Sequence, residues 1–373
     1  MDFVDPNPDH PNSLPNGQET CGAFEYDPLN LGEDSRVAKV ALITGISGQD
    51  GLILAERLIR NGYVVHGTSR HCSTSLVQKV RNFLIQQHST EEIDQQLRLI
   101  ESSLLNAEAA KKLIDEVAPD EIYHLAGQSR VGRSFEIPVE TFEANTQSTL
   151  NLLEAVRKST SDHKPRFLLA GSAEIFGGSD EALLSETSRY APRSPYAASK
   201  LSAQMLVETY RESYKLFACT AILFNHESLL RTPEFVTGKI AQGVARIALG
   251  LDQKLVLGNL NIGRDWGDAS DTVEAMRLIL SASHPEDFVV ATGTWRSLTD
   301  FLDAAFRVVG LNWHDYVETS SEFLRPVDTP RLVGDASKLR SKLGWKPRSE
   351  FTEMVEQMVR HYLQVERGTA SIE

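Results

Sequence analysis

Short apolar runs alternate with amphipathic stretches from residue 38 to about residue 223. The runs are rich in Val, Ile and Leu, which is typical of strands buried on both faces of a parallel sheet. We expect strands at residues 40–44, 63–67, 97–101, 121–125, 166–170 and 217–223. Helical spacing predicts helices from the glycines after residue 44 to residue 60 and at 76–86, 107–117, 139–158 and 196–214. This alternation predicts an α/β fold with a doubly wound parallel Rossmann sheet.

The two ends of the chain differ from this region in composition and in hydrophobic pattern. Residues 1–37 are rich in Pro, Asn, Asp and Gly, which predicts a disordered or loosely packed extension. We expect the Rossmann domain at residues 38–228, with part of 265–295 interleaved. Residues 229–373 are punctuated by proline and predict mainly a smaller, mixed substrate-binding lobe. Its expected helices are at residues 236–249, 271–283, 299–309 and 351–364.

Composition narrows the class of protein. The net charge of −13 disfavours a nucleic-acid partner, which would require clustered positive charge. Cys21, Cys72 and Cys219 show neither disulfide nor metal-site spacing, so we expect a reducing compartment and no metal. No apolar run has the length of a membrane span, and the first residues lack a signal-peptide pattern. We therefore expect a soluble cytoplasmic protein without a membrane partner.

A glycine-rich segment follows the first expected strand. The sequence TGISGQDG places Gly45, Gly48 and Gly51 between this strand and a helix. Glycine at these positions lets backbone N–H groups approach a pyrophosphate at the N-terminus of the helix. A tight strand–helix turn without a ligand is the alternative. The position after the first strand favours dinucleotide binding.

The residues after the second expected strand indicate which dinucleotide is bound. An NAD site usually has an acidic residue here, which accepts a hydrogen bond from the ribose 2′-hydroxyl. This sequence has no acid at that point and has Arg70 instead. A guanidinium suits a 2′-phosphate, so NADP is preferred over NAD. The alternative is a solvated surface arginine.

A second motif carries acid–base chemistry. In the sequence SPYAASK, Tyr196 and Lys200 are four residues apart on an expected helix, so their side chains are neighbours. Lowering the tyrosine pKa from ~10 to ~7 requires about 4 kcal/mol of preferential phenolate stabilisation. A lysine ammonium and the positive nicotinamide ring can provide it, so that Tyr196 can take a proton from a substrate hydroxyl. Taken alone, this spacing also occurs by chance on helix surfaces.

Ser172 makes the chance explanation weaker. It follows the strand expected at 166–170, at the carboxyl end of the sheet, where ligands bind in open α/β folds. Its hydroxyl can bond the substrate oxygen and share its proton, although a turn serine is the alternative. Ser172, Tyr196 and Lys200 in this order predict a dehydrogenase-type centre.

Motifs along most of the chain resemble the extended short-chain dehydrogenase/reductase family, and within it the GDP-mannose 4,6-dehydratases. The matching stretches are TGISGQDG, HLAGQSRV, GSAEIFG, RSPYAASKL, ILFNHES, FVTGKI, LGNLNIGRDWGDASD, PEDFVVATG and LGWKP. They extend from about residue 39 to about residue 347. ILFNHES and RDWG are the most specific to the dehydratases.

The resemblance implies a role for Glu174, which in such enzymes acts as base and acid two positions after the catalytic hydroxyl. Tyr196 would deprotonate the 4-hydroxyl while NADP accepts hydride from C4. Glu174 would then remove the C5 proton and return a proton to the leaving 6-hydroxyl, before hydride is delivered to C6. The alternative for Glu174 is a carboxylate salt-bridged at the sheet edge.

The resemblance also implies binding residues and a homo-oligomer, at least a dimer through the helices at 139–158 and 196–214. The substrate would be a nucleotide sugar, with GDP-mannose as the expected one. Cofactor contacts are expected from Gly45, Ile46, Ser47, Gly48, Gln49, Asp50, Gly51, Arg70, Ser73, Leu104, Leu125, Ala126, Gly127, Gln128, Ser129, Lys200, His226 and Arg231. Substrate contacts are expected from Asn225, Lys239, Arg264, Arg325 and Asp328. For any single charged residue among these, a surface ion pair is the alternative.

Some positions depart from the family pattern. Arg70-His71-Cys72-Ser73 stands where Arg-Arg-Ser-Ser is usual, and Ser102-Ser103-Leu104 replaces Gly-Asp-Leu. After NHES, Leu229 to Thr232 replace Pro-Arg-Arg-Gly. A different GDP-sugar, a net NADPH-dependent 4-reductase or epimerase, and a binding protein that retains the dinucleotide fold therefore stay open as alternatives.

Overall fold

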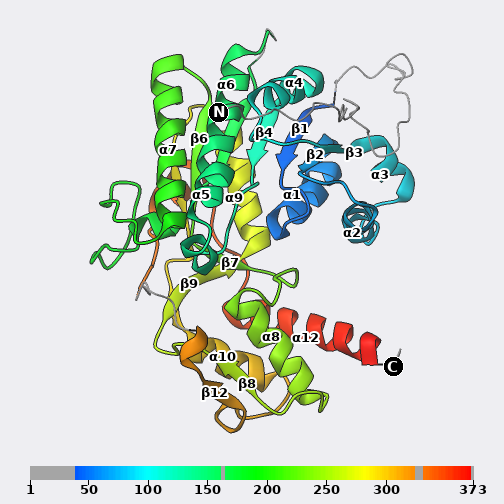
Figure 1. Ribbon diagram of the computed structural model, residues 1–373, viewed down its shortest axis with the longest axis vertical. Helices are drawn as coiled ribbons and strands as arrows, with labels where there is room; N and C mark the ends of the chain where they lie inside the picture. The colour runs from blue at the N-terminus through cyan, green and yellow to red at the C-terminus, as the bar shows by residue number, and fades with distance from the viewer. Residues whose placement is uncertain (1–37, 161–163, 324–330, 371–373) are drawn as a thin grey trace, which may run out of the picture.

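The computed structural model describes residues 38–160, 164–323 and 331–370, so the expected N-terminal extension lies outside the described residues. Figure 1 shows a sheet covered by helices and, below it, a smaller lobe. The seven strands of the sheet are all parallel and follow the order β10-β6-β5-β4-β1-β2-β3. They are β1 (Val40–Thr44), β2 (Val64–Ser69), β3 (Leu97–Glu101), β4 (Glu121–His124), β5 (Arg166–Ala170), β6 (Ala218–Leu223) and β10 (Phe288–Val290). The predicted doubly wound parallel sheet is confirmed.

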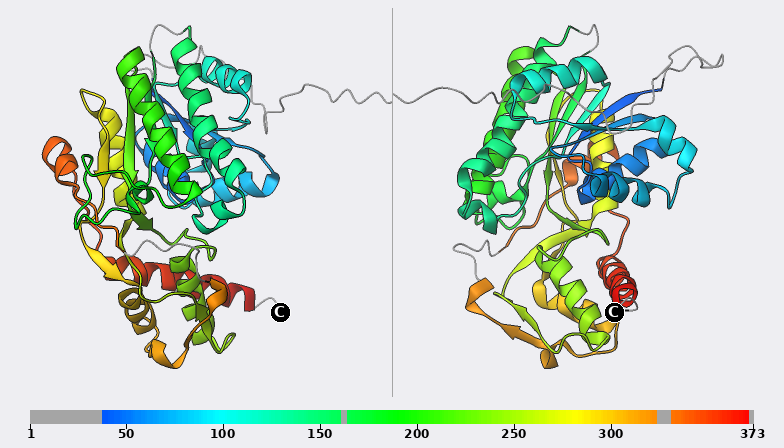
Figure 2. Two further views of the ribbon diagram at one scale, coloured as in Figure 1. Left: turned by 60° about the vertical axis from the view of Figure 1, so that its left-hand side comes forward. Right: turned by 45° about the vertical axis from the view of Figure 1, so that its right-hand side comes forward.

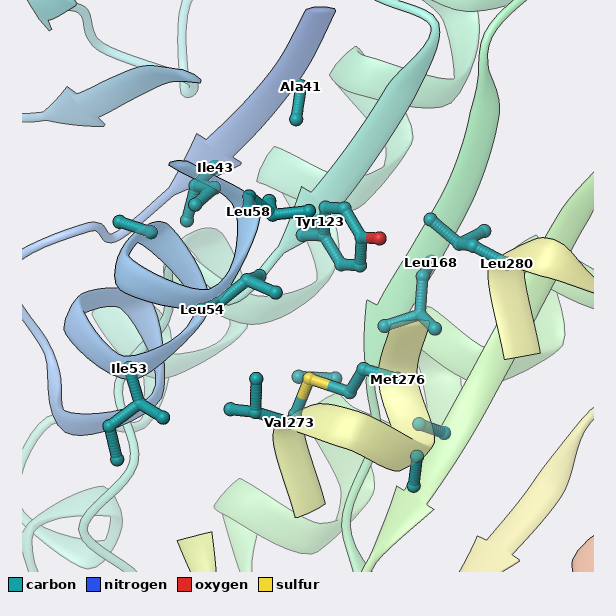
Figure 3. Close-up of a cluster of buried hydrophobic side chains, with 14 of the residues drawn as sticks. Ala41, Ile43, Ile53, Leu54, Leu58, Tyr123, Leu168, Val273, Met276 and Leu280 are labelled. Atoms are coloured by element: carbon teal, nitrogen blue, oxygen red, sulfur yellow. The ribbon is translucent and has the colours of Figure 1, made fainter. Parts of the chain in front are cut away.

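Helices cover both faces of this sheet (Figure 2). Alternate residues of β1 belong to different cores: Ala41 and Ile43 pack with α1 and α9, whereas Leu42 packs with α4, α6 and α7. Figure 3 shows Leu54 and Leu58 of α1 close to Tyr123 on one side of the first core, and Val273 and Met276 of α9 on the other. Burial on both faces explains the continuous apolar runs of the strands. The helices concerned are α1 (Gln49–Arg60), α2 (Thr74–Leu84), α3 (Thr90–Gln96), α4 (Ala107–Val117), α6 (Ser148–Lys158), α7 (Pro195–Tyr214) and α9 (Ala269–Ser281).

The smaller lobe has its own hydrophobic core. Its helices are α8 (Val236–Ala248), α10 (Leu298–Arg307) and α12 (Phe351–Ala370), and they pack with β8 (Leu255–Leu257) and β12 (Val317–Thr319). A three-stranded sheet of β11 (Trp295–Ser297), β9 (Gly263–Asp268) and β7 (Asn225–Glu227) accompanies the lobe. The chain returns to the large sheet with α9 and β10, and α11 (Ser337–Leu343) packs beside them. The boundary expected at residue 228 stays a prediction.

One expected helix is interrupted. Residues 139–158 form α5 (Pro138–Phe142), a π-helical segment (Glu143–Gln147) and α6, rather than a single α-helix. In the wide turn, the Ser148 hydroxyl donates to the carbonyl of Ala144 and the Thr149 hydroxyl donates to the carbonyl of Asn145. Such π-helical turns often occur at functional sites, and this one aims the Asn145 side chain at a loop of the candidate site.

Other elements escaped the sequence pattern. Helix α3 was not expected, although Ser89 and Glu92 form a capping box at its start. The three-residue strands of the smaller lobe are too short to show a period. Short 3₁₀ segments lie at Gly132–Phe135, Ala173–Phe176, Trp313–Asp315 and Ser321–Phe323.

Candidate active site

The glycine-rich turn joins β1 to α1. Gly45 has a φ of +75°, and a Cβ atom there would lie 2.9 Å from the Cα atom of Ala126, so only glycine is tolerated. A Cβ atom at Gly51 would lie 2.5 Å from the carbonyl oxygen of Gly45. Gly48 is the N-cap of α1, and within the described part of the chain no side chain caps the first N–H groups of this helix. The turn therefore presents uncapped backbone donors, which fit a pyrophosphate.

The loop after β4 is fixed beside this turn. The Thr44 hydroxyl oxygen accepts hydrogen bonds from the backbone N–H groups of Leu125 and Ala126, both at 3.1 Å. Asn145 bonds the backbone of Gln128 twice, at 2.9 Å as acceptor and at 3.1 Å as donor. The structure thus brings expected cofactor residues of two segments together. Thr44 and Asn145, which position the loop, were missed by the sequence reasoning because their contacts are long-range.

Ser172, Tyr196 and Lys200 meet at the carboxyl end of β5. Helix α7 begins after Ser194, whose hydroxyl oxygen accepts a hydrogen bond from the N–H of Ala197 at 3.0 Å, so Tyr196 lies in its first turn. Tyr196 is 8% exposed, and its phenol is hydrogen-bonded to Ser172. Lys200 is 7% exposed, and its Nζ donates to the carbonyl of Ala170 at 2.9 Å. The predicted triad is therefore assembled and largely excluded from water.

Burial controls the titration of this group. It raises the pKa of Tyr196 to about 12, against the opposing effect of the hydrogen bond to Ser172, and the charge of Glu174 raises the pKa further. Burial also lowers the pKa of Lys200 to about 8. The sequence led us to expect that Lys200 would lower the pKa of Tyr196. In the protein, desolvation of the phenol outweighs the charges around it, so the protein groups alone do not provide the lowered pKa.

Glu174 lies in the 3₁₀ turn after Ser172, near enough to the phenol of Tyr196 for its charge to raise the pKa of that phenol. Its Oε1 is 3.9 Å from an Nη atom of Arg264, which projects from β9 and is 5% exposed. Arg264 was expected to contact the substrate, and the structure places it next to the expected catalytic carboxylate. The salt bridge that was the alternative explanation for Glu174 is thus present, with a long separation of 3.9 Å. It does not remove the carboxylate from the neighbourhood of the triad.

His226 and Arg231, two expected cofactor residues, bond other parts of the protein. His226 Nε2 lies 2.9 Å from Asp50 Oδ2, and Nδ1 lies 2.8 Å from the carbonyl of Phe224. Arg231 Nε donates to Glu227 at 2.6 Å. Burial alone would raise the pKa of Asp50. The charge and hydrogen bond of His226 outweigh this effect and lower the pKa to about 2. Asp50 in turn raises the pKa of His226 despite burial. This pair joins the first turn of α1 to β7.

The other expected cofactor residues lie on the β2–β3 side of the sheet, beyond the carboxyl ends of these strands. Arg70 follows β2 and is exposed. Ser73 is the N-cap of α2, where its hydroxyl accepts from the N–H of Leu76 at 3.3 Å. The Leu104 side chain is buried, and its carbonyl accepts from Asn151 at 2.8 Å. The structure therefore gives Ser73 and Leu104 local structural partners in addition to any ligand.

The expected substrate contacts are only partly described. Asn225 is exposed at the start of β7, and Lys239 on α8 is half-buried, with its pKa lowered by desolvation. Arg325 and Asp328 lie outside the described residues. Over the described parts of the chain, no group of His, Cys, Asp or Glu side chains is arranged to hold a metal ion. None of the helices described here is long and apolar enough to cross a membrane.

Comparisons with known proteins cover both the large sheet and the smaller lobe. The family model described as GDP-mannose 4,6 dehydratase matches residues 42–358. GDP-mannose 4,6 dehydratase 2 of Arabidopsis thaliana is 46% identical over 323 residues, which are 86% of each chain. The Homo sapiens GDP-mannose 4,6 dehydratase is 39% identical over 345 residues, covering 88% of this chain and 92% of that protein. The structure of the UDP-glucose 4-epimerase of Thermus thermophilus in complex with NAD is 26% identical, with a TM-score of 0.72 over 87% of this chain and 98% of that chain.

Proposed function

The chain belongs to the GDP-mannose 4,6-dehydratase family, and from this we propose that it removes water from GDP-mannose to give GDP-4-keto-6-deoxymannose. The observation that carries the proposal is the placement of Glu174 next to a buried Ser172–Tyr196 pair. A simple dehydrogenase needs only the serine, tyrosine and lysine. A carboxylate close to the same phenol can supply the additional base that elimination requires.

We assign the dinucleotide to the glycine-rich turn and the loop after β4. The uncapped N-terminus of α1 and the close approach of Gly45 to Ala126 support this assignment. Arg70 supports NADP over NAD, because a guanidinium suits the 2′-phosphate. When bound, NADP supplies the acceptor and then the donor of the hydride that passes from C4 to C6 of the sugar.

The protein residues handle the protons. Tyr196, bonded to Ser172, takes the proton of the 4-hydroxyl. The positive charge of a bound nicotinamide ring would offset the desolvation that raises the pKa of this phenol. The resulting 4-ketone acidifies the C5 proton, which Glu174 removes. Glu174 then protonates the leaving 6-hydroxyl, which departs as water. Tyr196 returns the proton that it took from O4 to C5 of the product, so the reaction balances with the loss of one water.

Lys200 keeps the triad in place and adds positive charge beside the cofactor loop. Its Nζ lies 3.8 Å from the position that a Cβ atom of Gly127 would take, and it is bonded to the carbonyl of Ala170. The side chain therefore spans the space between β5 and the loop after β4. We propose that it also contacts the nicotinamide ribose, as expected from the sequence.

Replacement of Glu174 tests the function. Glu174→Gln should reduce dehydration of GDP-mannose by roughly 10²–10⁴-fold, because an acid–base group is lost while its shape is kept. The product is identified by NMR and mass spectrometry, and exchange of the C5 proton in D₂O should stop in the same variant. Glu212→Gln, at an exposed position on α7, is the matched control.

The outcomes distinguish the alternatives. A Glu174→Gln variant with normal dehydration contradicts the assigned mechanism. Stoichiometric consumption of NADPH or formation of a sugar epimer would instead support the reductase or epimerase. Turnover of another GDP-sugar in preference to GDP-mannose would change the substrate, and binding of cofactor without any turnover would support a binding protein.

We also propose that the chain forms a homodimer through α5, α6 and α7. Val139 and Phe142 on α5 are 66% and 39% exposed, and Met205 on α7 is 46% exposed, so these helices present apolar side chains to solvent. A surface hollow with a mainly apolar lining adjoins Val139 and Phe142. Sedimentation of Val139→Lys should show a smaller species than the wild type. The cytoplasmic location stays a prediction.

A further inference from the structure

The carboxyl ends of β2 and β3 carry an acid that the sequence rule for dinucleotide sites does not detect. That rule looks for an acid at the end of the second strand, where this chain has Ser69 followed by Arg70. In the sheet, Ser69 is in register with Glu101, the last residue of β3. Oε2 of Glu101 accepts a hydrogen bond from the N–H of Cys72 at 2.8 Å. A carboxylate from the neighbouring strand is thus held against the turn that carries Arg70.

Two cations lie at the same edge. Arg70 is exposed, and it makes no hydrogen bond or ion pair with any residue that the structure describes. Lys79 projects from α2, and its Nζ donates to the carbonyl of Ser47 in the glycine-rich turn at 2.8 Å. Lys79 was not among the expected cofactor residues, because only the tertiary structure brings helix α2 next to the glycine-rich turn. The strands and helix concerned are neighbours in Figure 1.

A buried hydroxyl marks the same place. Ser102 follows Glu101, and its N–H donates to the carbonyl of Ser69 at 3.0 Å. Its Oγ is buried and has no hydrogen-bond partner within the described part of the chain. A buried hydroxyl without a partner is costly, and a bound ligand can provide the missing bond. Ser102 therefore places an unsatisfied hydroxyl next to Glu101 at this edge.

We propose that Glu101 weakens the preference of this protein for NADP: its carboxylate opposes a 2′-phosphate and accepts a hydrogen bond from a 2′-hydroxyl, so that NAD also binds. Arg70 and Lys79 are the cations that favour the 2′-phosphate. The inference rests on the proposed binding of a nicotinamide dinucleotide and adds the residue that decides between its two forms.

The size of the effect follows from the charges. The 2′-phosphate carries a charge of nearly −2 at neutral pH, and the side chain of Glu101 is 52% exposed. Two such groups several ångströms apart in a highly solvated place interact by about 1 kcal/mol, which corresponds to roughly five- to tenfold in affinity. Salt should reduce this effect, because exposed charges are screened beyond about one Debye length.

Equilibrium binding of NADP⁺ and NAD⁺ to the full chain, measured by calorimetry at low salt, tests the proposal without using activity. Glu101→Gln keeps an oxygen that can accept from Cys72 and removes the charge. It should raise the ratio of the NAD⁺ to the NADP⁺ dissociation constant roughly five- to tenfold. Arg70→Ala and Lys79→Ala should lower this ratio. Glu353→Gln, exposed on α12 in the other lobe, changes the net charge equally and should leave the ratio unchanged.

The remaining outcomes separate this inference from the proposed function. If Glu101→Gln melts like the wild type but has an unchanged ratio, Glu101 only anchors the turn and the inference is overturned. If the variant is unstable, Glu101→Asp, which keeps the charge, should bind with the wild-type ratio, and a raised ratio there also overturns it. A wild type that binds both dinucleotides but does not dehydrate GDP-mannose contradicts only the proposed function. A wild type that binds neither contradicts both.

Discussion

The two ends of the candidate site differ in how far water reaches their charged groups. At the carboxyl end of β5, Tyr196 and Lys200 are 8% and 7% exposed, and burial shifts the pKa of both. At the ends of β2 and β3, Glu101 and Arg70 are exposed, and solvent screens their charges. Both groups lie on the same edge of one parallel sheet. The fold therefore places the proposed proton-transfer residues where burial makes electrostatic interactions strong. It places the residues proposed to select the cofactor where solvent makes those interactions weak.

The largest effect is expected at the buried end. Tyr196→Phe should reduce dehydration of GDP-mannose by roughly 10³–10⁴-fold, because it removes the proposed acceptor of the 4-hydroxyl proton and leaves the packing intact. Single-turnover rates measure the loss, and binding of NADP⁺ should change little. Tyr214→Phe, at an exposed position on the same helix, is the control. Equal activity of both variants would remove Tyr196 from the mechanism.

The Asp50–His226 pair should give the next largest effect, on stability. Asp50→Asn leaves a buried histidine without its anion, and we expect a loss of about 2–3 kcal/mol in the free energy of unfolding. The pKa of Asp50 is lowered to about 2, so its contribution is present above the unfolded value of 3.8 and is lost as pH falls toward 2. The pKa of His226 is raised, so its contribution is present below 6.5 and is lost as pH rises through the folded value.

The difference between wild type and Asp50→Asn should therefore be largest between about pH 4 and pH 6.5. Urea unfolding at several pH values measures it. A difference that does not depend on pH would mean that the variant disturbs packing rather than an ion pair. Asp94→Asn, which removes an exposed ion pair on α3, should cost less than about 1 kcal/mol at every pH.

Lys200 should show a smaller effect of opposite sign. Its pKa is lowered from 10.5 to about 8 by burial, so the folded protein binds the proton less tightly than the unfolded chain. The cost to stability is complete below pH 8 and disappears as pH rises to 10.5. Lys200→Met should therefore stabilise the cofactor-free protein below pH 8 by about 2 kcal/mol, after the loss of the Ala170 hydrogen bond is subtracted. Thermal melts at about pH 7 and about pH 10 check this; equal shifts at both would contradict the assigned protonation.

The smallest effect is expected from salt at the exposed end. Raising KCl from about 0.05 M to about 0.5 M shortens the Debye length to a few ångströms. The affinity for NADP⁺ should fall several-fold, because it depends on exposed cations. The single-turnover rate at saturating cofactor and substrate should change less than about twofold, since the triad is buried. If the single-turnover rate fell with salt as much as the affinity for NADP⁺, the proposed difference in screening between the buried and the exposed ends would be wrong.

The large sheet could be predicted because its sequence signals are local. Strands buried on both faces appear as short apolar runs, and glycines such as Gly45 stand where no side chain fits. The short strands β7 to β12 and helix α3 were not predicted, because elements of three to seven residues show little hydrophobic periodicity. The interruption of the expected helix at residues 139–158 escaped because its cause, the bonding of Asn145 to Gln128, is a contact between distant segments.

The sequence by itself determined the fold class and the identity of the candidate triad. The glycine-rich turn and the Tyr-x-x-x-Lys spacing are local motifs, each contained in one short segment of the chain. Only the tertiary structure decided what surrounds these residues. It set the pKa of Tyr196 above its ordinary value, because burial depends on every segment packed around the phenol. It also paired Asp50 with His226 and brought Glu101 of β3 to the turn after β2, since parallel strands align residues that lie far apart in the chain.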